Sequence, residues 1–196
     1  MEFKINQAEI SDCIFADEIS SLYTLSAQER DIGIAIRKPD YIKEKITKKN
    51  AIIAKYKGEL AGFCYIETFS NEGYVSNSGL IVKPKFRGKG LAKAIKKIAV
   101  KMARDRYPNA KLFGITTSNV VMKINSNLGY IPVAFHELTD DEEFWRGCSS
   151  CKNYDILRQN NCKMCLCTGM LAPSKNDMSR KKKLKSKIKS FISKGK

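Results

Sequence analysis

Residues 80–106 constrain the fold of this chain more than any other stretch. An apolar run from Leu80 to Val82 meets Pro84, the loop Arg87-Gly88-Lys89-Gly90 follows, and apolar residues at helical spacing continue to about Arg106. This order predicts a strand that ends at the proline, a tight glycine loop, and a helix that begins directly after the loop.

The loop has the chemistry of a phosphate site. The first turn of a helix carries unpaired backbone N–H groups and the positive end of the helix dipole, which together favour anions. Glycines let a phosphate approach the backbone closely, and Arg or Lys side chains add charged donors. We therefore predict that a phosphate group binds at Arg87, Gly88, Lys89, Gly90, Leu91 and Ala92.

Two other phosphate motifs are excluded. A dinucleotide fingerprint needs G-x-G-x-x-G, and the third glycine is missing here. A P-loop needs G-K-[ST], and that tripeptide does not occur.

The periodicity of the remaining chain predicts an α/β domain with a mixed sheet. Strands are expected at residues 3–5, 51–56, 60–69, 74–82, 111–117 and 130–135. Helices are expected at residues 8–25, after residue 39, at 90–106 and at 118–129.

The loop and the segments on either side of it resemble the GNAT acetyltransferases. Their acyl-CoA motif, Arg/Gln-x-x-Gly-x-Gly/Ala, is matched by Arg87, Gly90 and Ala92, with a Val-x-Pro lead-in at residues 82–84 and a closing Leu-Gly-Tyr at residues 128–130. The resemblance covers residues 3–135. It implies an α/β (α+β) fold with a mixed, mostly antiparallel central sheet flanked by helices. It also implies an N-acyltransferase that uses acetyl-CoA or another acyl-CoA as co-substrate.

The resemblance further implies where the chemistry occurs. Backbone amides near Ile81 and Val82 would hold the thioester carbonyl and stabilise the charge that develops there. A carboxylate would accept the proton of the attacking amine, often through water. Glu67 and Glu72 are the candidates for this base, and for each the alternative is a solvated surface charge.

The general acid stays open. The family often uses a Tyr late in the short helix to protonate the thiolate, and Asn125 occupies that position here. Asn125 stays a candidate for ligand contact. Asn119 either reaches the pantetheine arm of the cofactor or caps the helix. His136 is the only histidine, so any Ser-His-Asp or Cys-His centre would have to use it. We interpret it as a surface residue, with substrate contact as the alternative.

Five of the seven cysteines lie between residues 148 and 167. Cys148-x-x-Cys151 and Cys162-x-x-Cys165 could supply four thiolates to a tetrahedral Zn²⁺. Cys165 and Cys167 together with the first pair are an alternative ligand set. Reduced structural thiols and redox or disulfide chemistry are the other interpretations. We predict a GNAT domain at 1–140 and a small Cys-rich C-terminal appendage at 141–173.

The basic charge is concentrated in the last residues. The formal net charge is +16, but nine Lys or Arg and no acid lie between residues 179 and 196, so the remaining chain carries +7. Residues 174–196 are predicted to be a solvated, disordered tail. Binding of nucleic acid through this tail is the alternative, which the sequence does not favour.

The segments 138–145, 153–157 and 165–171 resemble a bacterial GNAT subgroup associated with arginine biosynthesis. The acceptor would then be a small amine, glutamate, acylated with an acetyl or succinyl group. Arg37, Lys38 and Arg146 are candidate clamps for its carboxylates. The other candidates are a protein, tRNA or ribosomal acceptor. With no signal peptide and no long apolar run, we expect a cytoplasmic protein without a membrane partner. A homodimer is left open.

Overall fold

A computed structural model describes residues 1–30 and 33–180 of the chain. It contains one seven-stranded sheet in the order β1-β2-β3-β4-β5-β7-β6. All neighbouring strands are antiparallel except β4 and β5, which are parallel. The strands are β1 Lys4–Gln7, β2 Ala51–Tyr56, β3 Glu59–Phe69, β4 Tyr74–Val82, β5 Lys111–Thr116, β6 Ile131–Val133 and β7 Thr168–Ala172. The predicted mixed, mostly antiparallel sheet is confirmed.

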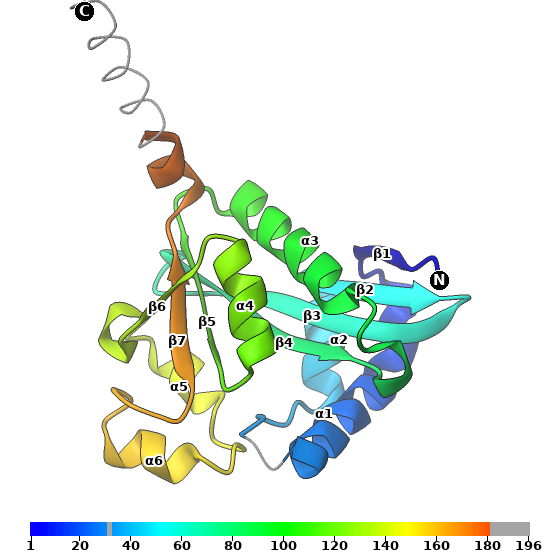
Figure 1. Ribbon diagram of the computed structural model, residues 1–196, viewed down its shortest axis with the longest axis horizontal. Coiled ribbons are helices and arrows are strands. Elements are labelled where there is room, and N and C mark those ends of the chain that lie inside the picture. The colour runs from blue at the N-terminus through cyan, green and yellow to red at the C-terminus, as the bar shows by residue number, and fades with distance from the viewer. Residues whose placement is uncertain (31–32, 181–196) are drawn as a thin grey trace, which may run out of the picture.

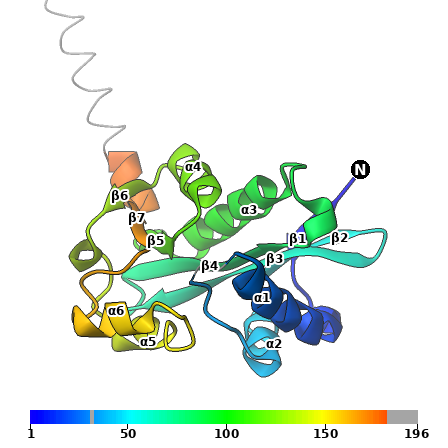
Figure 2. The ribbon, with the colours of Figure 1, turned by 60° about the horizontal axis from the view of Figure 1, so that its bottom comes forward.

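Helices cover both faces of this sheet (Figures 1 and 2). On one face lie α3 Leu91–Arg106 and α4 Asn119–Asn127. On the other lie α1 Ala16–Arg30, α2 Pro39–Thr47, and the short helices α5 Glu142–Arg146 and α6 Tyr154–Gln159. Three 3-10 turns, Ile10–Phe15, Pro84–Phe86 and Phe135–Glu137, connect them. Among the described residues, none of these helices has the length and apolar character needed to cross a membrane.

Local sequence explains where the helices begin and what they bury. Pro39 opens α2, where its missing N–H costs nothing, and the Ser118 hydroxyl accepts from the Val121 N–H at the start of α4. The apolar stripe of α3 recurs every four residues and packs on the sheet at Leu91, Ile95, Ala99 and Ala103. A second core forms under α1 and α2 around Ile19, Ile42, Ile46 and Phe63.

The first predicted helix is corrected at its start. Residues 10–15 form a 3-10 turn, and the regular helix begins only at Ala16. Ile10 and Ile14 lie in this turn, and both are exposed.

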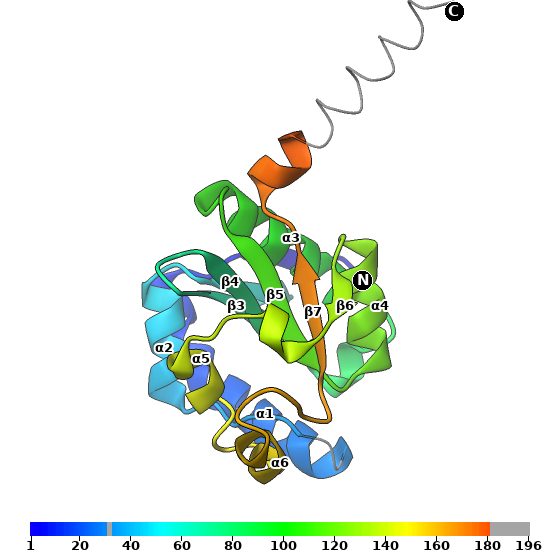
Figure 3. The same cartoon turned by 90° about the vertical axis from the view of Figure 1, so that its left-hand side faces the viewer.

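The Cys-rich segment, predicted as an appendage, is part of the sheet. Its last residues form β7, which pairs antiparallel with β5 on one side and β6 on the other (Figure 3). The sheet therefore extends across the boundary that we predicted near residue 140. Gly169 makes this possible, because a Cβ there would lie 2.9 Å from the carbonyl oxygen of Val133 in the neighbouring strand.

The same segment also builds a third core. Trp145 is 6% exposed and donates its indole N–H to the Thr139 carbonyl at 2.9 Å. It packs with Phe113 of β5 and Leu157 of α6. The face of the sheet beside α1 and α2 is thus covered at β5 by the C-terminal segment.

Two irregularities of β4 shape the centre of the molecule. The β3–β4 register shifts between the pairs Phe63↔Ile81 and Tyr65↔Ser78, which leaves a bulge at Gly79. The parallel ladder between β4 and β5 runs only from Tyr74↔Lys111 to Ser76↔Phe113. Beyond Ser76 the two strands part, and a gap opens between residues 77–82 of β4 and the end of β5.

Gly79 tests the importance of the bulge. Its φ is +63°, and an added Cβ would lie 2.3 Å from Tyr65 Cε1 and 2.6 Å from Tyr23 Oη. We predict that Gly79→Ala lowers the melting temperature strongly, because the left-handed backbone costs an alanine roughly 1–2 kcal/mol and the tyrosines must also move.

The matched control is Gly58→Ala, where φ is +82° and a Cβ would meet nothing within 4 Å. Its melting temperature should fall only by the amount that corresponds to placing an alanine in a left-handed backbone conformation. Equal melting temperatures for the two variants would mean that the tyrosines do not depend on this glycine.

Candidate active site

The glycine loop is open at its surface and has the backbone that only glycine adopts easily. Gly88 has φ +77° and Gly90 has φ +75°, and a Cβ at either position would meet nothing within 4 Å. Gly90 caps α3 without a side-chain hydrogen bond, and the first turn of α3 holds no acid. The first N–H groups of this 16-residue helix are thus available to an anion.

The other residues of the loop hold it in place or face solvent. Arg87 donates from Nε to the Val82 carbonyl at 3.2 Å and from Nη2 to the Ser26 hydroxyl at 3.3 Å, so it fastens the loop to β4 and α1. Lys89 is exposed. Leu91 is 3% exposed and anchors the start of α3 in the core, while Ala92 leaves the next turn small.

The gap beside β4 presents backbone groups. Lys83 N–H donates to the Ala61 carbonyl of β3. The N–H groups of alternate residues in a strand point to the same neighbouring strand. The N–H of Ile81 therefore also faces β3, whereas the N–H groups of Leu80 and Val82 face the gap. Of the two predicted amides, the geometry favours Val82 over Ile81 and adds Leu80, which the sequence reasoning missed.

On the opposite face of the sheet, aromatic and charged side chains surround the bulge. The Tyr23 hydroxyl donates to the Gly79 carbonyl at 2.5 Å, and Arg37 Nε donates to the Tyr65 hydroxyl at 2.7 Å. Burial, with a smaller effect of Tyr65, raises the pKa of Tyr23 well above its ordinary value, so this phenol stays protonated. Arg37 lies in the loop before α2, and its hydrogen bond to Tyr65 of β3 places the guanidinium beside the bulge.

The C-terminal segment holds Arg37 in this position. Arg37 Nη1 donates to the Gly147 carbonyl at 3.3 Å, and the neighbouring Ile36 N–H donates to the Ser150 hydroxyl at 2.9 Å. In the part of the chain that the structure describes, no ion pair joins Arg37 to a carboxylate. Its guanidinium keeps hydrogen-bonding capacity that a bound carboxylate can use.

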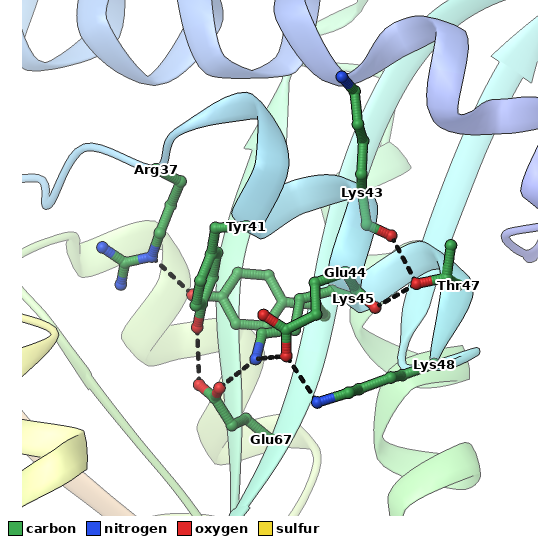
Figure 4. Close-up of polar contacts among 9 residues, drawn as sticks. Arg37, Tyr41, Lys43, Glu44, Lys45, Thr47, Lys48 and Glu67 are labelled. Carbon is green, nitrogen blue, oxygen red and sulfur yellow. Dashed lines mark hydrogen bonds and ion pairs between the residues drawn. The ribbon is translucent and has the colours of Figure 1, made fainter.

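Glu67 belongs to the same cluster (Figure 4). One carboxylate oxygen accepts from the Tyr41 hydroxyl at 2.8 Å, and the other forms an ion pair with Lys45, whose side chain is 7% exposed. On β3, Glu67 lies opposite Ser76, the last β4 residue in the ladder with β5. Burial, followed by the effects of Tyr65 and Glu67, raises the pKa of Tyr41 far above its ordinary value, which keeps this hydroxyl a donor.

The other predicted catalytic residues, Glu72 and Asn125, and the predicted cofactor contact Asn119 lie outside this cluster. Glu72 is exposed in the β3–β4 turn, with φ +62°, at the end of β4 away from the glycine loop. Asn125 is 2% exposed and donates to Met170 Sδ of β7 at 3.6 Å. Asn119 is exposed at the start of α4, where Ser118 makes the capping bond.

The other candidate clamps do not join Arg37. Lys38 is exposed at the N-terminus of α2. Arg146 and His136 line a surface cavity together with Trp145 and Cys162. Of the three predicted cations, only Arg37 is bonded to a residue beside the bulge, the Tyr65 hydroxyl.

The predicted zinc ligands are not assembled as a metal site. Among residues 1–30 and 33–180, no three or more His, Cys, Asp or Glu side chains form a group that could hold a metal ion. Cys162 faces the surface cavity beside Glu142, whereas Cys165 Sγ approaches the Asn153 carbonyl at 3.9 Å. All five thiols of the segment are free.

Four of these cysteines, Cys148, Cys162, Cys165 and Cys167, pack against the third core. Burial and nearby thiols raise the pKa of Cys148 to about 11 and that of Cys167 to about 12, so both are protonated at neutral pH. In the structure they act as small apolar side chains.

Comparisons with known proteins agree with this geometry. The model of the Acetyltransferase (GNAT) family matches residues 18–122, which span the glycine loop and both strands of the gap. No curated protein sequence is recognisably similar to the chain.

Several solved structures share the fold at low sequence identity. N-acetylglutamate synthase from Neisseria gonorrhoeae, complexed with coenzyme A and N-acetyl-glutamate, superposes with a TM-score of 0.64 at 17% identity over 89% of this chain. The match covers 35% of that synthase, so the chain spans about a third of its length.

Two others match over nearly their whole length. Rv2747 from Mycobacterium tuberculosis, in complex with CoA, has a TM-score of 0.63 at 16% identity, covering 87% of this chain and 98% of that one. The yncA protein from Salmonella typhimurium, with its cofactor acetyl-CoA, has a TM-score of 0.59 at 14% identity, covering 88% and 94%.

The loop assignment can be tested at Gly90. We predict that Gly90→Val weakens CoA binding at least tenfold in calorimetric titration, because the side chain would occupy the surface that a phosphate must approach. Gly58→Val is the control, since Gly58 also has positive φ and open space but lies in the β2–β3 turn. CoA affinity that Gly90→Val leaves unchanged would contradict the assignment.

Proposed function

Because the chain belongs to the GNAT acetyltransferase family, we propose that this acyl-CoA-dependent N-acetyltransferase acylates the amine of a small acidic amino acid such as glutamate. The carrying observation is Arg37, a half-buried guanidinium beside the gap that has no carboxylate partner among the described residues. A substrate carboxylate would supply that partner. The link to arginine biosynthesis is part of the same proposal.

The cofactor would bind along β4. Its pyrophosphate would lie on the first turn of α3, against the backbone of Gly88 and Gly90, with Lys89 and Arg87 as charged neighbours. The pantetheine arm would then run along β4 toward Ser76, and the amides of Leu80 and Val82 would donate to its carbonyl groups. The thioester carbonyl would accept one of these N–H groups, which stabilises the oxyanion as the amine attacks.

The acceptor would approach from the other face of the sheet. Arg37 would bind a carboxylate, and Glu67 would accept the amine proton, directly or through water. Tyr41 and Lys45 position the Glu67 carboxylate through the two contacts described above. The attack brings the amine nitrogen to the thioester carbon, the C–S bond breaks, and CoA leaves.

The rival interpretation concerns a larger acceptor. It depends on the basic tail, and residues 181–196 lie outside the described part of the chain. The Arg37 cluster instead favours a small anionic substrate, so we do not extend the proposal to nucleic acid or to a protein acceptor.

Substrate choice is tested by CoA release with a panel of amino acids. We predict release with glutamate, and a loss of about a hundredfold or more in kcat/KM for Arg37→Met, because a buried carboxylate contact is removed. Lys38→Met, the exposed neighbour in the same loop, should behave as wild type.

Release with neutral amino acids but not with glutamate, or equal effects of the two variants, would contradict the acidic acceptor. Acetyl-CoA and succinyl-CoA are both supplied in this assay, so that the acyl group is not assumed.

The role of Glu67 is tested separately. We predict that Glu67→Gln lowers kcat by roughly 10²–10⁴ with little effect on acetyl-CoA binding, because the amide cannot accept the amine proton. Glu44→Gln is the matched control: Glu44 also lies near Lys45, at 3.6 Å, but is more exposed and pairs with Lys48. An unchanged kcat for Glu67→Gln would assign the base to another group.

A further inference from the structure

Lys96 is a buried cation on the cofactor side of the sheet. It lies in the second turn of α3, the helix that begins at the glycine loop, and it is 2% exposed. Its Nζ donates to the Asn77 carbonyl at 3.0 Å. Among the described residues no carboxylate forms an ion pair with it, although a buried ammonium normally requires one.

Its position coincides with the apex of the gap. In the β4–β5 ladder, Lys111 N–H donates to the Gly73 carbonyl. Since alternate carbonyls of a strand face the same neighbour, the carbonyls of residues 75 and 77 also point toward β5. Asn77 is the first residue beyond the ladder, so Lys96 occupies the place where the next inter-strand hydrogen bond would form.

A second buried donor lies beside it. Asn77 is 5% exposed, its Oδ1 accepts from Cys64 Sγ at 3.1 Å, and its Nδ2 has no partner within the described residues. Burial raises the pKa of Cys64 to about 11, so this thiol is neutral and does not balance the ammonium. Two buried N–H donors are thus available for an anion.

Space for that anion exists over β5. Leu112 faces the α3 core and Phe113 the opposite one, so Gly114 faces α3 again. A Cβ on Gly114 would meet only the Asn77 carbonyl, at 3.5 Å. From α4, Asn125 reaches Met170, the β7 residue paired with Gly114. Asn125 stands where the resemblance led us to expect a tyrosine, so that position of α4 supplies no phenol.

We propose that Lys96, assisted by the Asn77 amide, receives the thiolate of CoA at the apex of the β4–β5 gap and protonates it. The proposal rests on the acyl-CoA site and not on the identity of the acceptor. The thioester is neutral, so the ammonium lacks an anionic partner before reaction. Negative charge appears on sulfur only as the C–S bond breaks, and an interaction made only then accelerates the step.

The step balances without a further reagent. The amine nitrogen bonds to the thioester carbon, and the tetrahedral intermediate collapses. The electron pair of the C–S bond goes to sulfur, and one proton passes from Lys96 Nζ to that sulfur to give CoA as the thiol. Lys96 then recovers a proton from solvent, equal to the one released by the amine. Burial lowers the pKa of Lys96, which favours this transfer.

The direct test measures the thiol of bound CoA. Its ionisation is followed by ultraviolet thiolate absorbance in full-length protein, with the desulfo-CoA complex as reference for the protein cysteines. We expect the thiol pKa of bound CoA to be at least one unit lower in wild type than in Lys96→Met. Lys96→Met should also lower kcat with acetyl-CoA by about 10² or more, while the Kd for acetyl-CoA changes less than threefold.

The controls separate this role from a structural one. Lys97→Met changes the exposed neighbour and should match wild type in both measurements. Lys96→Met should fold, with a melting temperature at or above that of wild type, because a buried charge is removed. Lys96→Arg retains the cation, so it should keep most of the lowered thiol pKa while losing kcat.

Three results would overturn the proposal. The thiol pKa could be the same in wild type and Lys96→Met. Acetyl-CoA and desulfo-CoA could lose affinity equally in Lys96→Met, which would make Lys96 a support for the strand. A preference for succinyl-CoA over acetyl-CoA that disappears in Lys96→Met would assign the ammonium to an acyl carboxylate. Failure of wild type to bind CoA at all would instead contradict the acyl-CoA site itself.

Discussion

The parting of β4 from β5 is the constraint on which the rest of the structure depends. A parallel ladder that stops at Ser76 leaves several backbone groups of β4 without a strand partner, which a compact domain normally avoids. The bulge at Gly79 shifts the register so that Leu80 and Val82 face the opening. Helices on both sides supply donors to the unpaired part of β4: Lys96 of α3 to the carbonyl of Asn77, and Tyr23 of α1 to the carbonyl of Gly79.

In the proposed reaction the two substrates bind on opposite faces of the sheet. The helices α3 and α4 lie on one face, and α1 and α2 lie on the other (Figure 2). The proposed acyl donor and acceptor would therefore meet at the gap. The C-terminal segment contacts both the sheet and the loop that carries Arg37. Its strand completes the sheet beside β5, and the turn after α5 holds the Arg37 loop through Gly147 and Ser150.

The features that could be predicted from the sequence are those that depend on residues close together in the chain. The strand, proline, glycines and helix of residues 80–106 follow one another directly, so their arrangement could be predicted. β7 could not, because Thr168–Ala172 is short, contains a glycine and is a strand only between β5 and β6. Arg37 was identified as one of several cations, but its choice over Lys38 and Arg146 depends on contacts with residues more than a hundred positions away. Lys96 was not among the predicted site residues, because a lysine within an amphipathic helix ordinarily faces water.

The charges around the gap differ in how they are balanced. Lys45 is buried with Glu67 as its counter-ion, so that pair is complete within the described chain. Arg37 and Lys96 lack a carboxylate partner there. Burial lowers the pKa of Lys96, so this charge lowers the stability of the free protein relative to an apolar residue of similar shape. Burial alone would lower the pKa of Arg37, but the nearby Tyr65 hydroxyl raises it. Removing the Lys96 charge should therefore stabilise the fold unless it distorts the packing. Both groups face the gap from opposite sides. In the proposed reaction an anion reaches each of them: a substrate carboxylate at Arg37, and the departing thiolate at Lys96.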